Sequence, residues 1–486
     1  MTTPKPTHYD AIIIGSGQGG TPLATALAEA KHKTALIERA HLGGCCVNEG
    51  CTPTKTMIAS GRVAHLVRRG AEYGVHSSGS GDNAVTTDML RVRQRKREIV
   101  ASFRAGSERR LREAGVEVLM GEARFVDGEG EGEKRMVVAM REGGVRVVSA
   151  DTVVVNTGCR PAVPVVEGIE RIPGERVLDS SSVMELGEVP RHLVVVGGGY
   201  IGVEFGQLFR RLGARVTLLH RGMQLLPRED QDLADMLLDV FRDEGVEVLL
   251  ETTPVRILSS PNSDGAFDVL MRTKQGDRVL QGATHILFAA GRVPNTECLN
   301  LGAAGVSTDA KGYIVTNEYL ETSVPSIYAI GDVKGLPAFT HISYDDSRIL
   351  RSSLLPSRPA AQRRSTRDRL VPYVAFTDPQ FAHVGLHEHE ARERYPDKQI
   401  LTAQMPMSYV ARALEIDETR GAMKAVVDAE SGLILGFSCL GVEGGELMGV
   451  VQMAMVGELP YHRLRDAVFA HPTLAECLNN LWGFLK

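Results

Sequence analysis

Short apolar runs separated by amphipathic stretches fill the first part of the chain, a pattern typical of parallel strands joined by helices. Residues 11–14 are apolar throughout and predict a strand buried on both faces. Leu23 and Leu27 then lie on one side of a predicted helix. A second predicted strand, residues 34–37, ends at Glu38. This order of strand, helix and strand indicates an α/β fold.

The same order returns in the middle of the chain. Residues 193–196 are apolar and predict a strand, a helix is expected through Glu204, and residues 215–219 predict the next strand. The expected fold class is therefore α/β, with two similar strand–helix–strand units.

Each first strand leads into a glycine-rich turn. Residues 15–20 and 197–202 both fit the spacing G-x-G-x-x-G, whose glycines let the backbone approach a pyrophosphate at a helix N-terminus. Alone this spacing is a weak signal, but Glu38 follows the first turn at the place where an acid binds a ribose, which makes the first site a strong prediction. The predicted dinucleotide-binding residues are Gly15, Gly17, Gly20 and Glu38 in the first unit, and Gly197, Gly199 and Gly202 in the second.

The second unit carries His220 and Arg221 where the first carries an acid. An acid repels a 2′-phosphate, whereas a cationic pair attracts it. The sequence therefore favours NADPH at the second site, with NADH as the less favoured coenzyme. The alternative is that Arg221 is an ordinary solvated arginine after a strand.

Two cysteines, Cys46 and Cys51, follow the first nucleotide motif. Their spacing allows a disulfide within one helical turn, so we expect both on one face of a helix, beside a cofactor. A zinc site would need a second Cys/His pair at ligand spacing, which the sequence lacks, so no metal ligand is predicted. A structural disulfide is the other alternative, but the seven scattered cysteines form no wider cystine framework.

Composition narrows the function classes. A chain of 486 residues is expected to form three or four domains, and its 51 glycines suit many tight turns. The net charge of −5 gives no basic surface for nucleic acid, and no apolar run has the length of a membrane span. Residues 1–10 are short and polar and show no targeting pattern, so a cytoplasmic location is expected.

Further motifs extend these two sites into a resemblance over nearly the whole chain. The sequence resembles the class I pyridine nucleotide–disulfide oxidoreductases, or flavoprotein disulfide reductases. The segments that carry the resemblance, besides the two glycine turns and the cysteine pair, are Thr157-Gly158, residues 290–295, residues 326–332, residues 371–379 and residues 471–476.

The resemblance implies two Rossmann-like domains and a C-terminal α+β dimerisation domain. The implied segments are 1–162 (FAD-binding, with the redox disulfide), 163–290 (NAD(P)H-binding), 291–365 (return to the FAD domain) and 366–486 (dimerisation). It further implies FAD, a pyridine nucleotide, and a homodimer whose two active sites are each shared between subunits.

The resemblance also implies roles for particular residues. Cys51 would become the thiolate next to the flavin and Cys46 would attack the substrate, with the thiolate stabilised by a helix N-terminus and a nearby cation. The implied catalytic residues are Cys46, Cys51, His471, Glu476, Lys55 and Glu204. The implied further cofactor-binding residues are Gly44, Lys55, Thr157, Gly158 and Asp332 for FAD, and Tyr200 and Gly291 for NAD(P)H. The plainer alternatives are that His471 is a structural histidine and that Tyr200 is a packing tyrosine. Lys55 and Glu204 would then be a surface lysine and an unrelated helix glutamate.

Within the family, the sequence is most similar to bacterial copper(II) reductases of reactive-chlorine resistance and to the mercuric-reductase-like group. Residues 226–230, 339–346 and 459–466 carry this likeness. The chain departs from true mercuric reductases because it has no vicinal cysteine pair at its end and no metal-binding domain before Gly15, and Cys45 is unusual beside Cys46.

The predicted function is transfer of electrons from NAD(P)H through FAD to the Cys46–Cys51 disulfide, and on to a thiol/disulfide or a metal ion such as Cu(II) or Hg(II). One alternative is a dihydrolipoamide dehydrogenase. An alternative of another class is a flavin-binding redox sensor or scaffold with little turnover.

Overall fold

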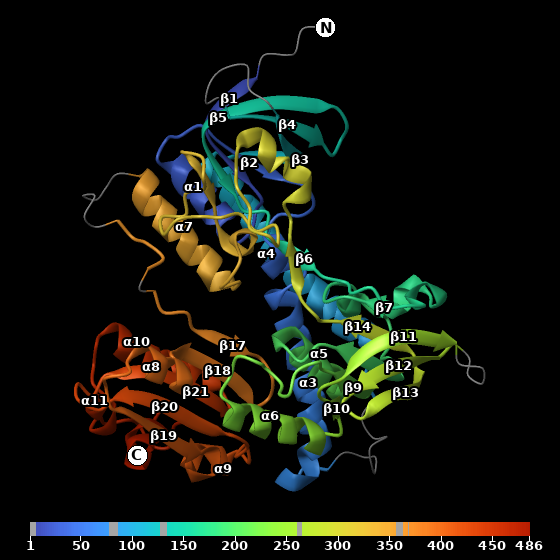
Figure 1. The fold of residues 1–486 in the computed structure, drawn as a ribbon, viewed down its shortest axis with the longest axis vertical. Coiled ribbons are helices and arrows are strands. Elements are labelled where there is room, and N and C mark those ends of the chain that lie inside the picture. The colour runs from blue at the N-terminus through green and yellow to red at the C-terminus, as the bar shows by residue number, and fades with distance from the viewer. Residues whose placement is uncertain (1–5, 77–85, 127–133, 260–264, 356–362, 368) are drawn as a thin grey trace. The chain divides into compact units, whose positions relative to one another are not determined.

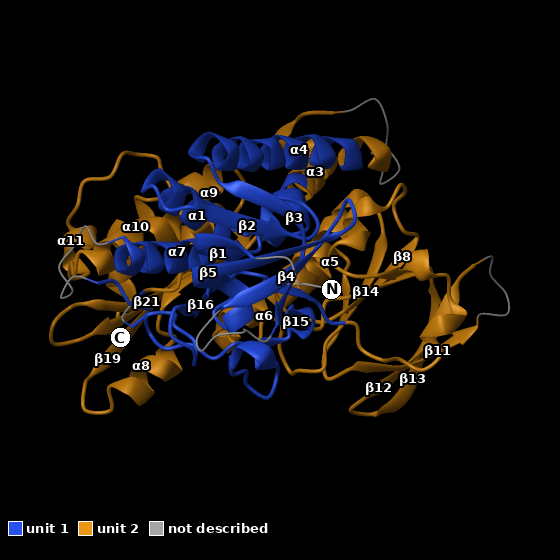
Figure 2. Cartoon of the chain, turned by 90° about the horizontal axis from the view of Figure 1, so that it is seen from above, with its two compact units in different colours: residues 1–56, 93–162, 291–369 blue, residues 57–92, 163–290, 370–486 orange. Residues whose placement is uncertain are grey.

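Two compact units make up the computed structural model of the chain (Figure 2). One unit comprises residues 1–56, 93–162 and 291–369, and the other comprises 57–92, 163–290 and 370–486. The structure describes residues 6–76, 86–126, 134–259, 265–355, 363–367 and 369–486. The finer division into four segments stays a prediction.

The first unit is built on a sheet whose parallel part is ordered β3-β2-β1-β5-β16. Strand β4 is antiparallel and pairs with both β3 and β5. The strands are β1 (Thr7–Ile14), β2 (Thr34–Glu38), β3 (Glu117–Val126), β4 (Arg135–Met140), β5 (Val145–Val155) and β16 (Ile327–Ala329), with a separate pair β6 (Cys159–Pro161) and β15 (Arg292–Pro294).

Alternate residues of β1 pack on opposite faces of this sheet. Ile13 packs in a cluster with Leu23 and Ile349, while Ile12 packs on the other face with Val153. The sheet is thus covered on both sides, as apolar parallel strands require. The helices of this unit are α1 (Gly20–Glu29), α2 (Gly44–Asn48), nearly all of α4 (Met89–Ala114) and α7 (Thr340–Leu354); α3 (Cys51–Arg69) begins in this unit and continues into the other.

The second unit contains a parallel sheet ordered β10-β9-β8-β14-β7 and a three-stranded antiparallel sheet, β11-β12-β13. Helix α5 follows β8 directly, which repeats the strand–helix–strand order of the first unit. The elements are β7 (Val177–Leu178), β8 (His192–Val196), α5 (Tyr200–Leu212), β9 (Arg215–Leu219), α6 (Gln231–Asp243), β10 (Glu247–Leu249), β11 (Thr253–Ser259), β12 (Phe267–Thr273), β13 (Gly276–Ala283) and β14 (His285–Phe288).

The C-terminal part of this unit is a five-stranded antiparallel sheet ordered β17-β18-β21-β20-β19, drawn in orange to red in Figure 1. Helix α10 contacts β18 and β21. The elements are β17 (Tyr373–Ala375), β18 (Gln380–Gly385), α8 (Glu388–Arg394), β19 (Ile400–Pro406), α9 (Ala411–Glu415), β20 (Ala422–Asp428), β21 (Ile434–Gly441), α10 (Gly444–Val456), α11 (His462–Arg465) and α12 (Cys477–Asn480). These sheets confirm the predicted α/β class with an antiparallel C-terminal part.

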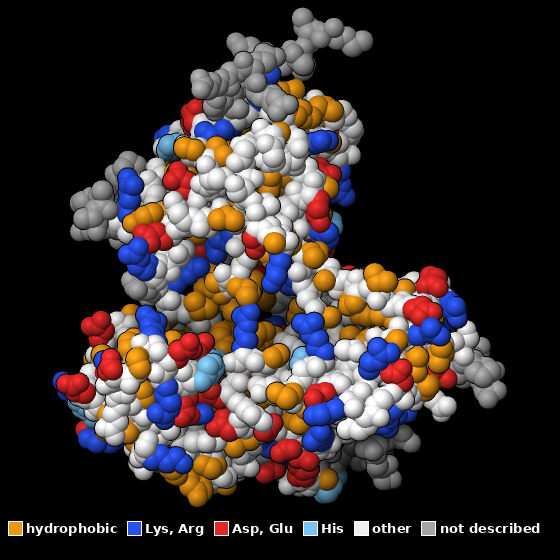
Figure 3. Space-filling model, in the orientation of Figure 1, with side chains coloured by type: hydrophobic (Ala, Val, Ile, Leu, Met, Phe, Trp, Pro, Cys, Tyr) orange, Lys and Arg blue, Asp and Glu red, His pale blue; other side chains and the backbone are white. Residues whose placement is uncertain are grey.

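Basic and acidic side chains are interspersed over the face drawn in Figure 3. Among the residues that the structure describes, no helix combines the length and the apolar character needed to cross a membrane.

Candidate active site

The first glycine turn is a tightly packed loop at the end of β1. Gly15 has φ +104°, and a Cβ there would collide with the carbonyl oxygen of Asn156. A Cβ on Gly44 would lie 2.5 Å from the Cα atom of Gly17. The two glycine segments therefore pack backbone to backbone, and neither position accepts a side chain.

Asn156, directly after β5, ties this turn to the rest of the unit. Its Oδ1 accepts a hydrogen bond from the Gly20 backbone nitrogen at 2.9 Å, and its Nδ2 donates to the Ile330 carbonyl oxygen at 2.9 Å. It thus fixes the first residue of α1, the helix whose N-terminus faces the turn.

Glu38 lies at the end of β2, as predicted, and is buried. Its Oε2 accepts hydrogen bonds from the backbone nitrogen and the hydroxyl of Ser16, at 3.1 and 2.6 Å, and its Oε1 accepts one from the Ala40 nitrogen at 2.8 Å. Among the described residues, the buried hydroxyl of Thr157 has no hydrogen-bond partner. A close-packed glycine turn, an acid at the next strand end and an unsatisfied hydroxyl fit the predicted FAD.

Asp332 is the other predicted flavin contact. It lies in a short 3-10 helix after β16, and burial raises the pKa of its carboxyl against the lowering effect of Arg292 and Lys334. Gly331, beside it, donates its backbone nitrogen to Asp346 at 2.8 Å. Asp332 and Gly158 thus belong to the same unit as the first glycine turn.

The two cysteines lie on two helices, so the prediction of a single helix is wrong. Cys46 is within the short helix α2, whereas Cys51 is the first residue of α3. Gly50 separates them and lies close to the preceding turn, because a Cβ there would be 2.9 Å from the Cys45 carbonyl oxygen. The break places Cys51 at a helix N-terminus, where the helix dipole favours a thiolate.

Both thiols meet at Thr340, the first residue of α7. The Cys51 Sγ lies 3.3 Å from the Thr340 Oγ1, and Cys46 hydrogen-bonds with both Cys51 and Thr340. The hydrogen bond with Cys51, and then burial, raise the pKa of Cys46 well above its usual range. When one thiol of the pair is ionised, the other therefore keeps its proton. Because Cys51 lies at the N-terminus of α3, we assign the thiolate to Cys51.

Cys45, the unusual neighbour of Cys46, points to a different partner. Its Sγ lies 3.5 Å from the Arg292 Nη2, which also donates to the Cys159 carbonyl oxygen at 2.6 Å.

The second glycine turn repeats the first with one exchange. The His220 Nδ1 accepts a hydrogen bond at 3.1 Å from the backbone nitrogen of Gly198, the equivalent of Ser16, which donates to Glu38. Burial, and then the charge of Arg221, lower the pKa of His220. The expectation of a cationic pair is therefore wrong for His220, a neutral part of the turn, while Arg221 is exposed.

Tyr200 and Glu204 lie in the first turns of α5, directly after the second glycine turn. The Tyr200 hydroxyl donates to Glu229 at 2.9 Å, and the buried Glu204 accepts from the Phe376 nitrogen at 2.8 Å. Lys55 and Glu204 belong to different units, so their ion pair stays a prediction.

His471 and Glu476 lie together near the C-terminus. The His471 Nδ1 is 2.9 Å from the nearer carboxylate oxygen of Glu476, and the imidazole is largely exposed. A carboxylate on Nδ1 leaves Nε2 free to accept a proton. The structure thus brings together His471 and Glu476, as the resemblance implied.

Three further residues were not found from the sequence. Asn156 immediately precedes the Thr157-Gly158 motif, Thr340 lies within residues 339–346, and Glu229 lies within residues 226–230. Thr340 and Glu229 thus lie inside segments that carried the resemblance and Asn156 lies next to one, but only the fold shows which thiol, tyrosine or amide each of them contacts.

Comparisons with known proteins agree with these two sites. Residues 9–347 match the pyridine nucleotide-disulphide oxidoreductase family and residues 371–481 match its dimerisation domain. The chain belongs to this family. The prediction of a flavoprotein disulfide-reductase-type enzyme that uses FAD and a pyridine nucleotide is therefore confirmed, and the dimerisation domain indicates a homodimer.

Several relatives span almost the whole chain. A probable pyridine nucleotide-disulfide oxidoreductase, RclA of Escherichia coli, is 37% identical over 482 residues, covering 98% of this chain and 99% of the relative. A Staphylococcus aureus mercuric reductase is 32% identical, covering 97% of this chain and 81% of the relative. The solved structure of HOCl-induced flavoprotein disulfide reductase RclA has a TM-score of 0.85 at 35% identity, covering 98% of this chain and all of that one.

Proposed function

We propose that this family member uses NADPH and passes electrons through Cys46 and Cys51 to a thiophilic metal ion of the Cu(II) or Hg(II) type. The observation that carries the proposal is the thiol pair gathered on Thr340. Thiolates are preferred ligands of soft metal ions. A similar protein, RclA, has been solved as a Cu(II) complex at 35% identity and a TM-score of 0.85, covering 99% of this chain and 100% of that chain, which supports this class of acceptor.

The residues divide the chemistry between them. FAD, when bound, supplies the dithiol with the electron pair taken from the pyridine nucleotide. Cys51 holds negative charge at the start of α3, and Cys46 reaches the acceptor. Oxidation of the Cys46 thiol and the Cys51 thiolate to the Cys46–Cys51 disulfide releases two electrons and one proton, and the two electrons reduce two Cu(II) ions to Cu(I).

We also propose that each active site is shared across the homodimer. In this arrangement the partner subunit's His471 takes the proton of Cys46, and the partner subunit's Glu476 fixes its tautomer. A cytoplasmic location is part of the proposal.

An acceptor panel tests the proposal. The enzyme is reduced anaerobically with NADPH and then mixed with Cu(II), Hg(II), a small disulfide, lipoamide, a quinone or oxygen, while reoxidation is followed. We expect Cu(II) or Hg(II) to reoxidise wild type fastest and Cys46→Ser slowly. Fastest turnover with lipoamide would instead favour the dihydrolipoamide dehydrogenase alternative, since a Bacillus subtilis dihydrolipoyl dehydrogenase is 32% identical, covering 96% of both chains. Negligible turnover with every acceptor would favour a sensor or scaffold.

A further inference from the structure

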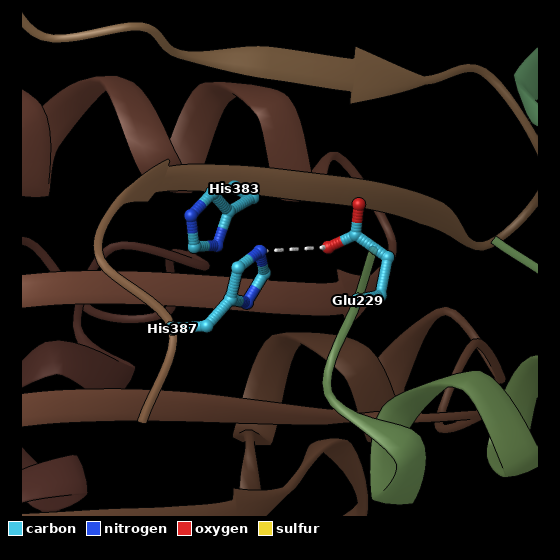
Figure 4. A group of neighbouring side chains, drawn as sticks. All are labelled: Glu229, His383 and His387. Carbon is cyan, nitrogen blue, oxygen red and sulfur yellow. Dashed lines mark ion pairs between the residues drawn. The ribbon is translucent and has the colours of Figure 1, made fainter. Parts of the chain in front are cut away.

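Glu229, His383 and His387 form a buried group in the second unit (Figure 4). Their types suggest a metal site, but their geometry does not. The two imidazole rings are stacked, with centroids 3.8 Å apart and planes 14° apart, so their in-plane lone pairs do not converge on one ion. The His383 Nε2 must donate to the Gly385 carbonyl oxygen at 3.1 Å, and its Nδ1 then accepts from Ser438 at 2.8 Å.

The Glu229 carboxylate of this group contacts Tyr200. The Glu229 Oε1 accepts the Tyr200 hydroxyl at 2.9 Å. The ring of Tyr373 packs on Tyr200 with centroids 5.6 Å apart, and its hydroxyl lies 3.2 Å from the His387 Nε2. Because Tyr200 begins α5 at the second glycine turn, within residues 197–202, the group holds a side chain at the edge of the predicted pyridine-nucleotide site.

The surroundings of Glu229 allow its carboxyl group to gain or lose a proton. Its side chain is fully buried, and its Oε2 has no hydrogen-bond donor among the described residues, with the His387 Nε2 3.8 Å away. Burial raises the pKa of Glu229 to about 7 against the hydrogen bonds of Tyr200 and Tyr373, which lower it; of the nearby charges, Asp230 raises the pKa and Arg228 lowers it. Asp230 itself is paired with Lys424 at 3.1 Å.

We propose that Glu229 is a positioning residue for the hydride-transfer step, because its carboxylate holds the Tyr200 hydroxyl and thereby restrains the ring that nicotinamide must displace. The inference rests on the proposed use of NADPH, and it takes Tyr200, which the resemblance assigns to the NAD(P)H site, as the side chain that moves when the coenzyme binds.

The restraint depends on the protonation of Glu229. An ionised carboxylate accepts a charge-assisted hydrogen bond that is about twice as strong as a neutral one, so it holds Tyr200 more firmly. We therefore expect NADPH to bind more weakly as pH rises through the titration of Glu229, by about fivefold.

Stopped-flow reduction of the anaerobic holoenzyme by NADPH, from pH 5.5 to 9, tests the inference. Wild type should show the rise in the dissociation constant of NADPH with little change in the limiting rate of reduction. Glu229→Gln keeps the shape of the side chain and Tyr200→Phe keeps the ring, and both should lose the rise. Glu388→Gln removes a carboxylate that pairs with Lys424 and with Arg392, each at 3.0 Å, and should keep it. A rise that persists in Glu229→Gln or in Tyr200→Phe overturns the inference.

A second measurement does not depend on NADPH. Infrared spectra of wild type minus Glu229→Gln should show the carbonyl band of one protonated carboxyl near pH 6, and Tyr200→Phe should shift that band. The absence of a shift would mean that Tyr200 is not held by Glu229. Failure of the proposed function looks different: wild type would not be reduced by NADPH, while the band and its shift would remain.

Discussion

Cys46 and Cys51 are neighbours with different surroundings, and this difference separates their roles. Cys51 begins the long helix α3, whereas Cys46 lies within α2 and the hydrogen bond with Cys51 raises the pKa of its thiol. This arrangement supports a single thiolate in the cysteine pair, on Cys51 at the start of α3.

Replacing the two cysteines one at a time tests that assignment. Cys51→Ser should keep FAD bound but lose the long-wavelength absorbance of the two-electron-reduced enzyme, because the ionised thiol is gone. Cys46→Ser should keep that absorbance and stop transfer to the acceptor. Anaerobic titration with NADPH, followed by visible spectra, distinguishes them. Wild-type behaviour of both variants with the physiological acceptor would contradict the dithiol mechanism.

Arg221 is the residue expected to select NADPH. A charge-assisted contact with the 2′-phosphate is worth on the order of 1.5–3 kcal/mol. Arg221→Ala should therefore raise the KM for NADPH by at least about tenfold and leave that for NADH nearly unchanged. Steady-state assays with both coenzymes measure this. Equal effects on the two coenzymes would show that Arg221 does not contact the phosphate.

Glu229 also predicts how stability depends on pH. The pKa of this buried acid is raised from 4.5 to about 7, so the folded protein binds its proton more tightly than the unfolded chain does. Its ionisation therefore costs stability as pH rises from about 4.5 to about 7, by about 3 kcal/mol in full above that range. Glu229→Gln should unfold at a higher denaturant concentration than wild type at pH 8 and at a similar one at pH 4.5. An equal difference at both pH values would contradict a raised pKa.

At the scale of the elements, periodicity predicted strands and helices well where apolar residues decide the structure. The expected strand at residues 11–14 is the end of β1, and residues 193–196 fall within β8. The single helix expected across the cysteines failed because Gly50 breaks it through a backbone contact with Cys45. Such a contact depends on how the chain folds back and leaves no periodic signal.

The parts of the site that sequence alone could not give are those joined across distant segments. Asn156 and Gly20 share a hydrogen bond although they are far apart in the chain, and so do Thr340 and Cys51. The single residues on either side of such a contact have no unusual local pattern. The family motifs located the segments, and the packing identified the partners.

Gly50→Ala tests the importance of the break between α2 and α3. The added Cβ would lie 2.9 and 3.1 Å from backbone atoms, which cannot move aside as a side chain can. We therefore expect the free energy of unfolding to fall by about 1–3 kcal/mol and Cys51 to be displaced. Denaturant unfolding and the rate of thiol modification measure both effects. Gly106→Ala, on α4 with open space around the new Cβ, is the matched control and should stabilise slightly. A Gly50→Ala enzyme as stable as wild type would contradict the close contact.

At the scale of the whole molecule, the proposed sharing of each active site between subunits predicts complementation. Cys46→Ser and His471→Ala homodimers should each be inactive. Mixed and allowed to exchange, they should form heterodimers with one intact site and one doubly damaged site, and recover at most about half of wild-type activity. Activity assays after subunit exchange measure this. No recovery in proven heterodimers would place His471 beside the cysteines of its own chain, or outside catalysis.

In each glycine turn the backbone amide of the second residue donates a hydrogen bond to a side chain at or just after the end of the next strand. The acceptor of Ser16 is the Glu38 carboxylate, and the acceptor of Gly198 is the His220 imidazole. The hydrogen bond that shapes the turn is therefore independent of the charge shown to the coenzyme. Since Arg221 is exposed, that charge can change without disturbing any packing. If Arg221 reads the 2′-phosphate as proposed, replacing this one side chain would change the preference for NADPH over NADH while the glycine turn keeps its shape.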